Sequence, residues 1–178
     1  NVGNTIYIST IGGHVYKYSS GVITPVADFI YSVNPSGVGV TEIISIGTDL
    51  YFSGPFDEVD SVSINGVAKF DTVGEVWSDI GGGSVAGVMT TDGTDIYAAF
   101  SGTIKKYNGS WATLGSALPI VYALEVYGTT VLAGTNSAAG GVVIWSGSSW
   151  DAFEGGVNGN VLAIATYLTD VYIGGTFT

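Results

Sequence analysis

Three lysines stand at equivalent positions of a repeated pattern and are the first residues that could contact a ligand. Lys17, Lys69 and Lys106 are each third in a four-residue segment that begins with Val or Ile and ends with an aromatic residue. Ile144 takes this position in a fourth copy. A row of ammonium groups can bind acidic groups, including those of sialylated glycans. A lysine stem packed along a sheet, with its ammonium in water near carboxylates, explains the same pattern, and the acidic composition favours this second interpretation.

Three tryptophans recur in the same way. Trp77, Trp111 and Trp150 each open a short apolar segment that follows a polar turn. Exposed indole rings would provide platforms for sugar rings, but recurring large aromatic residues more often fill the space between repeat units. We expect packing to be their main role. Together with the lysines they form the candidate ligand-contact set, which is Trp77, Trp111, Trp150, Lys17, Lys69 and Lys106.

The other polar residues do not form a catalytic or metal-binding set. His14 is the single histidine and Cys is absent, which argues against a transition-metal site and a Ser-His-Asp arrangement. We expect His14 to be a turn residue at the start of a strand. The acidic cluster at 57–60 lacks the alternating spacing of a Ca²⁺-binding loop, so we expect a solvated loop there.

Carboxylates also recur, at Asp49, Asp95 and Asp170, in short turns that precede apolar segments. An Asp in a turn often caps its own backbone, and repetition favours this role. Catalytic carboxylates would stand at unique positions. We therefore predict no catalytic residue, no metal site, no cofactor and no enzymatic activity.

Composition excludes several classes of protein. The chain of 178 residues has a net charge of -11 and only 4 basic residues, all Lys, which argues against binding to nucleic acid. With 46% hydrophobic residues it can bury enough apolar surface to fold. No apolar run approaches the roughly 18 residues that span a bilayer, so we predict no membrane insertion.

The elements that must position these residues are strands in an internal repeat. Similar apolar segments containing Tyr or Leu begin at residues 6, 50, 96, 131 and 171, which gives a period of about 41 residues. Each unit holds four short segments rich in Val, Ile, Tyr and Trp, separated by turns of Gly, Asn, Asp, Ser and Thr. This pattern predicts strands, and no window has the apolar period of a helix.

Four strands in about 41 residues are typical of a β-propeller blade. The sequence therefore predicts an all-β protein, a β-propeller built of four-stranded antiparallel blades. A β-sandwich has no reason to repeat the same four strands, a parallel β-helix has shorter coils, and a leucine-rich repeat needs a helical segment.

A family resemblance supports this fold. The segments 51–56, 65–71 and 76–83 resemble a kelch-like repeat of large bacterial, fungal and viral surface proteins, which reads apolar-Tyr-apolar-Gly-Gly-x-Phe and later Trp-x-x-Leu-Gly-Gly-Gly. Segments 145–150 and 155–159 are similar to it again. The resemblance implies a propeller but no particular activity. The first and third copies lack the Gly-Gly-x-Phe corner.

The repeat divides the chain into one propeller-type region, 1–178. The expected blade units are 1–39, 40–87, 88–120, 121–160 and a partial unit, 161–178. Both ends of the sequence fall on the same strand of a unit. We therefore expect a portion of a longer repeat array, with further repeats or subunits covering the terminal strand edges.

The preferred function is a non-enzymatic structural or binding module of a secreted, cell-surface or virion-surface protein. Rigid blades would hold loops that contact a protein or a glycan. The alternative is a carbohydrate-binding lectin propeller with one pocket per blade. A fragment of a propeller enzyme is a third hypothesis, which the lack of Arg, Cys and a second His disfavours.

Overall fold

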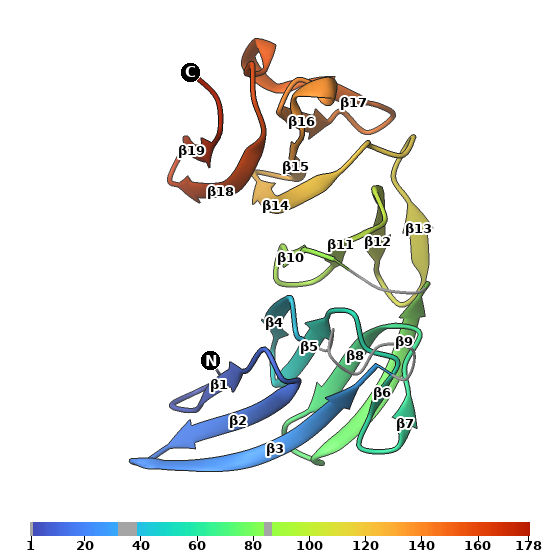
Figure 1. The fold of residues 1–178 in the computed structure, drawn as a ribbon, viewed down its shortest axis with the longest axis vertical. Coiled ribbons are helices and arrows are strands. Elements are labelled where there is room, and N and C mark those ends of the chain that lie inside the picture. The colour runs from blue at the N-terminus through green and yellow to red at the C-terminus, as the bar shows by residue number, and fades with distance from the viewer. Residues whose placement is uncertain (1, 32–38, 84–86) are drawn as a thin grey trace. The chain divides into compact units, whose positions relative to one another are not determined.

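A computed structural model describes residues 2–31, 39–83 and 87–178 (Figure 1). By its contacts the chain divides into two compact units, Asn1–Gly87 (unit one) and Val88–Thr178 (unit two). Both are built from antiparallel sheets, which we number I to V. The end of the first expected blade unit, at 32–38, lies outside the described residues, as does the segment 84–86.

Sheet I, in unit one, is a meander of three strands with an added hairpin. Its order is β1-β2-β3-β6-β7, with the bounds β1 (Ile6–Ser9), β2 (His14–Ser19), β3 (Val22–Ile30), β6 (Glu58–Val59) and β7 (Val62–Ser63). Ser20 and Gly21 link β2 to β3 with φ values of 52° and 86°. Two successive positive φ values match the twist of the flanking strands, which explains the tight turn.

The hairpin β6–β7 corrects the expectation of a solvated loop at 57–60. Glu58 and Val59 form β6 and pair with Ile30 and Phe29 of β3. Val59 is fully buried. Burying an apolar side chain of this size stabilises by about 1.5–3 kcal/mol, which holds this acidic segment on sheet I.

Sheet II, also in unit one, has four strands in the order β4-β5-β8-β9. Their bounds are β4 (Glu42–Ile46), β5 (Asp49–Ser53), β8 (Gly66–Asp71) and β9 (Val76–Gly82). The chain thus leaves sheet II after β5, forms the β6–β7 hairpin on sheet I, and returns as β8.

An aromatic cluster forms much of the core of unit one. The Trp77 ring lies 5.3 Å from Phe29, 5.1 Å from Phe52 and 4.6 Å from Phe70, measured between ring centroids. Phe29 comes from sheet I and the other three from sheet II, so the cluster joins the two sheets. Edge-to-face aromatic contacts add to the burial of these large side chains.

Unit two contains three sheets in sequence order. Sheet III is β10 (Met89–Thr91), β11 (Ile96–Phe100), β12 (Thr103–Tyr107) and β13 (Trp111–Thr113). Sheet IV is β14 (Val121–Tyr127), β15 (Thr130–Thr135), β16 (Val142–Trp145) and β17 (Trp150–Ala152). Sheet V is β18 (Val161–Tyr167) and β19 (Asp170–Gly175). Two short 3₁₀ turns, η2 (Ser137–Ala139) and η3 (Phe153–Gly155), flank β16 and β17.

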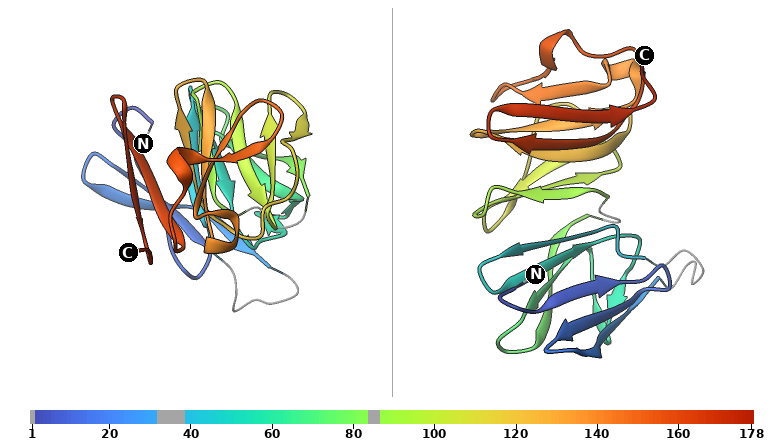
Figure 2. Two further views of the ribbon diagram at one scale, coloured as in Figure 1. Left: turned by 90° about the horizontal axis from the view of Figure 1, so that it is seen from above. Right: turned by 90° about the vertical axis from the view of Figure 1, so that its left-hand side faces the viewer.

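The three sheets of unit two pack on one another in turn. β10 and β11 contact β14, and β18 contacts β14 and β15 (Figures 1 and 2). The core between sheets III and IV contains Ile104, Leu124 and Val131 together with small residues such as Ala99 and Ala133. Small side chains on β11 and β15 let neighbouring sheets approach closely.

At Gly134 the backbones of sheets IV and V approach each other closely. A Cβ atom built at Gly134 would lie 2.8 Å from the carbonyl oxygen of Val161 on β18. A larger residue at this position would therefore push the two sheets apart.

The all-β prediction is confirmed, as is the prediction of four-stranded antiparallel sheets. Among the described residues the only helical elements are the two 3₁₀ turns, and no helix there has the length and apolar character needed to cross a membrane. Closure into a ring, the number of blades and the period of about 41 residues stay predictions.

Candidate functional site

The lysine column lies opposite a column of tyrosines on the neighbouring strand. The register pairs each lysine with a tyrosine on the adjacent strand of its sheet: Tyr7 with Lys17, Tyr51 with Lys69, and Tyr97 with Lys106. Directly opposed residues in an antiparallel pair are close enough for their side chains to interact. The ammonium of Lys69 lies 6.0 Å from the ring centre of Tyr51, and that of Lys106 lies 5.5 Å from Tyr97.

Two of these lysines form ion pairs with the recurring aspartates. Lys69 Nζ lies 2.7 Å from Asp49 Oδ2, and Lys106 Nζ lies 2.6 Å from Asp95 Oδ2. Asp49 and Asp95 each stand two residues before the paired tyrosine, so one Asp-x-Tyr pattern provides both contacts. The hydrogen bond to the carboxylate raises the pKa of each lysine above its ordinary value.

These pairs change the role expected for Asp49 and Asp95. Their carboxylates contact a lysine on the next strand instead of their own turn. The turn before β11 is capped by Asp92, whose Oδ1 accepts hydrogen bonds from the amides of Thr94 and Asp95 at 2.9 and 2.7 Å. Asp92 Oδ2 also accepts a hydrogen bond from the Tyr97 hydroxyl at 3.2 Å.

Lys17 departs from this arrangement because Thr5 stands where the other copies have Asp. Its ammonium instead donates to Glu75 Oε1 of sheet II at 2.9 Å. This hydrogen bond raises the pKa of Lys17. Of the three equivalent lysines, Lys69 and Lys106 thus form ion pairs within their own sheets, whereas Lys17 forms one between sheets I and II.

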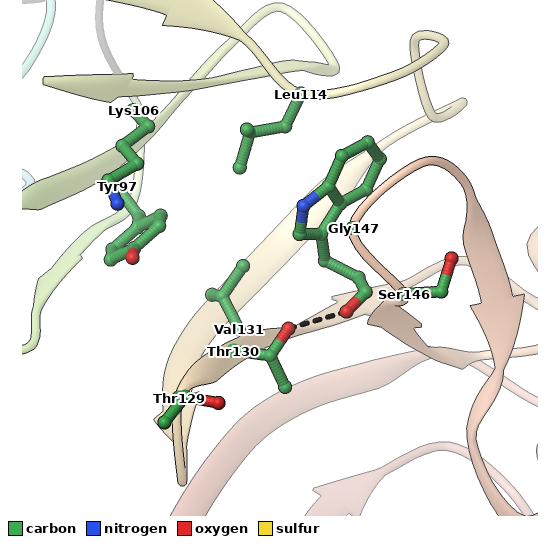
Figure 3. A pocket seen from close by; sticks show the side chains of 9 residues that line it. Tyr97, Lys106, Leu114, Thr129, Thr130, Val131, Ser146 and Gly147 are labelled. Carbon is green, nitrogen blue, oxygen red and sulfur yellow. Dashed lines mark hydrogen bonds between the residues drawn. The ribbon is translucent and has the colours of Figure 1, made fainter.

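A pocket of about 290 Å³ lies between sheets III and IV, and Lys106 and Tyr97 form one of its sides (Figure 3). Leu114 covers part of it, and the opposite side is formed by sheet IV. The lining residues from sheet IV and its hairpin turns are Thr129, Thr130, Val131, Trp145, Ser146 and Gly147. The Thr130 hydroxyl is held by a hydrogen bond to the carbonyl oxygen of Trp145 (Figure 3).

Trp145 is the main aromatic group of this pocket, and its ring packs against Gly115 and Trp150. A Cβ atom at Gly115 would lie 2.6 Å from Trp145 Cζ3, so only glycine fits against the indole. The Trp150 ring packs 5.3 Å from it. Within the described part of the chain, Trp145 Nε1 has no hydrogen-bond acceptor. The pocket thus offers an indole N–H, the ammonium of Lys106 and threonine hydroxyls around an apolar surface.

Similar pockets lie at the other sheet boundaries within each unit. A pocket of about 220 Å³ between sheets I and II is lined by Lys17, Val26, Phe70, Glu75 and Trp77, among others. Another, of about 480 Å³, lies beside sheets IV and V and is lined by residues that include Tyr127, Phe153, Asp170 and Tyr172. Lys17 and Lys106 are equivalent in the repeat, as are Phe70 and Trp145, so the first two pockets share one design.

The tryptophans expected at the site serve mainly in packing. Trp77 is buried in the aromatic cluster of unit one, Trp111 packs on Phe100 and Tyr107, and Trp150 donates its Nε1–H to the Leu114 carbonyl at 2.9 Å. Whether any of them contacts a ligand stays a prediction. Trp145 was not included among the ligand-contact residues predicted from the sequence. Trp145 is the last residue of the fourth copy of the segment that contains Lys17, Lys69 or Lys106 in the other copies, and every copy ends in an aromatic residue, which was a visible signal.

His14 begins β2, close to the turn position expected from the sequence. Its Nδ1 lies 2.7 Å from Asp28 Oδ1, and both side chains are exposed. Across the described ranges, no group of three or more His, Cys, Asp or Glu side chains is arranged to hold a metal ion.

No family model matches the chain, and no curated protein matches it by sequence. Solved structures do resemble it. The extracellular domain of BT4673 from B. thetaiotaomicron matches 99% of the chain with a TM-score of 0.71 and 14% identity. A chain of the mitotic checkpoint complex matches 96% with a TM-score of 0.69 and 17% identity. PorZ, a surface component of the type-IX secretion system of Porphyromonas gingivalis, matches 79% with a TM-score of 0.55 and 14% identity.

These similarities concern the fold. At 14–17% identity they show a propeller-like all-β arrangement and nothing about a shared site. The chain spans about a quarter (25%) of the BT4673 domain, 53% of the checkpoint-complex chain and 19% of PorZ.

Proposed function

We propose that the chain is a non-enzymatic binding module of a secreted, cell-surface or virion-surface protein. The observation that carries this proposal is the pocket between neighbouring sheets that occurs around Trp145 and Lys106 and again around Lys17 and Phe70. Concave sites with an apolar lining and a few fixed polar groups are typical ligand sites. Rigid sheets on both sides hold these groups in place without a ligand.

The proposed setting is a kelch-like propeller with a period of about 41 residues, within a longer array of repeats. Two of the similar structures are an extracellular domain and a bacterial surface component, which supports a surface location. A net charge of -11 with few ionisable groups suits a soluble exposed surface and opposes nucleic-acid binding.

A glycan is the ligand class that the pocket chemistry favours over a protein loop. The Trp145 indole provides an apolar face and an unpaired N–H, the Lys106 ammonium provides a donor, and the hydroxyls of Thr129 and Thr130 can accept hydrogen bonds. Sugar rings combine apolar C–H faces with hydroxyls that both donate and accept hydrogen bonds. This is the lectin alternative, with its pocket located between sheets.

A glycan array probed with the labelled chain tests the lectin alternative. We expect binding that Trp145→Ala reduces by at least about tenfold, because stacking and the indole hydrogen bond are lost together. Trp111→Ala is the matched control, since Trp111 lies outside this pocket, and should leave binding within about twofold. An array without binding, or equal losses in both variants, would contradict glycan binding at this pocket.

The non-enzymatic part of the proposal has its own test. The chain is incubated with p-nitrophenyl glycosides and p-nitrophenyl acetate, and the absorbance of released nitrophenol is followed. We expect no release above the rate with heat-denatured chain. Release that Lys106→Met abolishes would show that the pocket carries out chemistry and would contradict the proposal.

A further inference from the structure

The turn that joins β12 to β13 contains an Asn-Gly pair in contact with water (Figure 1). Asn108, Gly109 and Ser110 form this turn, and all three are exposed. Gly109 has a φ of 102°, and an added Cβ atom there would meet nothing within 4 Å. Asn-Gly is a favoured hairpin turn because both residues tolerate positive φ. The same pair is chemically reactive, because glycine has no side chain to shield its amide nitrogen.

An asparagine that precedes a glycine can react with its own backbone. The glycine amide nitrogen attacks Cγ of the asparagine, and the new C–N bond closes a five-membered succinimide ring. The Cγ–Nδ2 bond breaks, and ammonia leaves with the amide proton. Water then opens the ring at either carbonyl, which gives aspartate or isoaspartate. The reaction requires an asparagine side chain that is free to rotate and a glycine amide that is free of hydrogen bonds.

Both requirements are met at Asn108. Within the described ranges, the Gly109 amide donates no hydrogen bond and the Asn108 side chain makes none. The Asn108 amide lies 3.4 Å from the Ser110 carbonyl oxygen, which is long for a hydrogen bond. The turn is therefore held mainly by the strands on either side of it.

The sequence contains two other Asn-Gly pairs, at 65–66 and 158–159, and sheet II holds the first of them. The Asn65 amide donates to Asp79 Oδ1 at 3.0 Å, and the Asn65 carbonyl oxygen accepts from the Gly83 amide at 3.2 Å. Gly66 is buried and lies opposite Gly82 of β9. These contacts must open before the Asn65 side chain can reach the Gly66 amide.

The pair at 158–159 is held through the asparagine side chain. Asn158 Nδ2 donates to Thr178 Oγ1, and Asn158 Oδ1 accepts from the Thr178 amide, both at 3.0 Å. Gly159 is buried, and a Cβ atom there would lie 2.4 Å from the Thr176 carbonyl oxygen. The Asn158 side chain must give up two hydrogen bonds before it can rotate toward Gly159.

We propose that Asn108 is a site of spontaneous succinimide formation in the folded chain, whereas Asn65 and Asn158 are protected by their contacts. Water is the second reactant. Either product places a carboxylate in the exposed turn and adds a negative charge to a chain whose net charge is already -11. Isoaspartate also lengthens the backbone of the turn by a carbon atom. The inference is independent of the pocket around Trp145.

Isotope labelling from water measures the three sites together. The folded chain is incubated in mildly alkaline buffer made with H₂¹⁸O, and chymotryptic peptides are then analysed by mass spectrometry. Opening of the ring leaves an ¹⁸O atom at each reacted asparagine. We expect label at Asn108 to appear at least about fivefold faster than at Asn65 or Asn158, because those two sites must first open locally. In guanidinium chloride, which removes the contacts, the three rates should agree within about threefold.

Asn108→Gln is the matched variant, because it keeps an amide in the turn but would have to form a larger ring, which closes far more slowly. It should lose the fast labelling and leave Asn65 and Asn158 unchanged. Fragmentation of the labelled wild-type peptide should find isoaspartate beside aspartate at position 108, since direct hydrolysis of the side chain gives aspartate alone. Equal rates at the three sites of the folded chain, no labelling of Asn108, or aspartate alone would overturn the proposal.

Discussion

At the scale of single residues, the aspartates in and beside the hairpin turns have two chemical roles. Asp49 and Asp95 neutralise lysines across a strand pair, whereas Asp92 holds the backbone of its own turn. Burial opposes ionisation of Asp92, but the amides of Asp95 and Thr94 and the Tyr97 hydroxyl together lower the pKa of its carboxyl. The ionised form of Asp92 therefore stabilises unit two.

Replacing Asp92 should make this stabilisation visible as a dependence on pH. Asp92→Asn keeps an acceptor of the same shape but cannot ionise, and because the carboxylate is exposed and screened by solvent we expect it to lower the free energy of unfolding by at most about 1 kcal/mol at pH 7. A lowered pKa in the folded state contributes stability above the unfolded value of 3.8, and this contribution is lost as the pH falls through the folded pKa. Urea unfolding at pH 7 and pH 3 measures the difference.

The gap between wild type and Asp92→Asn should therefore narrow below pH 3.8. Asp151→Asn, which alters an exposed carboxylate on the neighbouring sheet, is the control and should show a smaller effect at both pH values. A gap that stays the same at pH 3 would mean that the charge of Asp92 contributes nothing.

At the scale of elements, the stacking of sheets in unit two depends on small residues where they meet. Gly134 of β15 and Gly174 of β19 occupy the same position of the hairpin, opposite Ala123 and Ala163. They differ in their surroundings. Gly134 is covered by Val161 of sheet V, whereas an added Cβ at Gly174 would meet only Ala163, at 4.0 Å.

This pair gives a matched test of sheet packing. Gly134→Ala should lower the free energy of unfolding by about 1–3 kcal/mol, because the new methyl overlaps the Val161 backbone. Gly174→Ala should leave it unchanged or raise it by up to about 1 kcal/mol, because the unfolded chain loses freedom and nothing is displaced. Thermal unfolding of the two variants and the wild type measures these changes in stability. Equal destabilisation would show that the hairpin backbone, and not the neighbouring sheet, sets the requirement for glycine.

At the scale of the whole molecule, the sequence predicted the sheets better than the site. Alternating Val, Ile and Tyr residues between Gly-rich turns identify the four-stranded pattern, because burial on a pleated sheet and tight turns both leave a local signature. The β6–β7 hairpin has two-residue strands, too short for any period, and only its contact with β3 makes it regular.

The site was harder to predict because its contacts join separate strands. An Asp that caps a turn and one that pairs with a lysine on the next strand look alike in sequence, which explains the error at Asp49 and Asp95. The pocket role of Trp145 likewise depends on Gly115, which lies in the connection between sheets III and IV. The equivalence of the three lysines could be predicted, because strands that repeat in sequence also pair in the same register.

The chain forms the β6–β7 hairpin on sheet I between β5 and β8 of sheet II, and this connection affects the order in which the sheets unfold. The hairpin β6–β7 lies in the connection between β5 and β8 of sheet II, and its strand β6 pairs with β3 of sheet I. Backbone hydrogen bonds therefore join sheets I and II, in addition to side-chain packing. Unit two has no such tie, since each of its sheets is continuous in sequence. We therefore expect unit one to unfold cooperatively and unit two to lose sheet V first.

Native-state hydrogen exchange at rising denaturant measures this difference. Amides of β1–β3 and of β4, β5, β8 and β9 should merge into one opening reaction of common free energy, whereas those of β18 and β19 should exchange at lower free energy than those of β14 and β15. Exchange of sheet II well before sheet I would show that the two-residue strands do not couple them. If the amides of sheets I and II do exchange in one common reaction, a detour of a few residues is what makes unit one unfold as a whole, whereas unit two opens one sheet at a time.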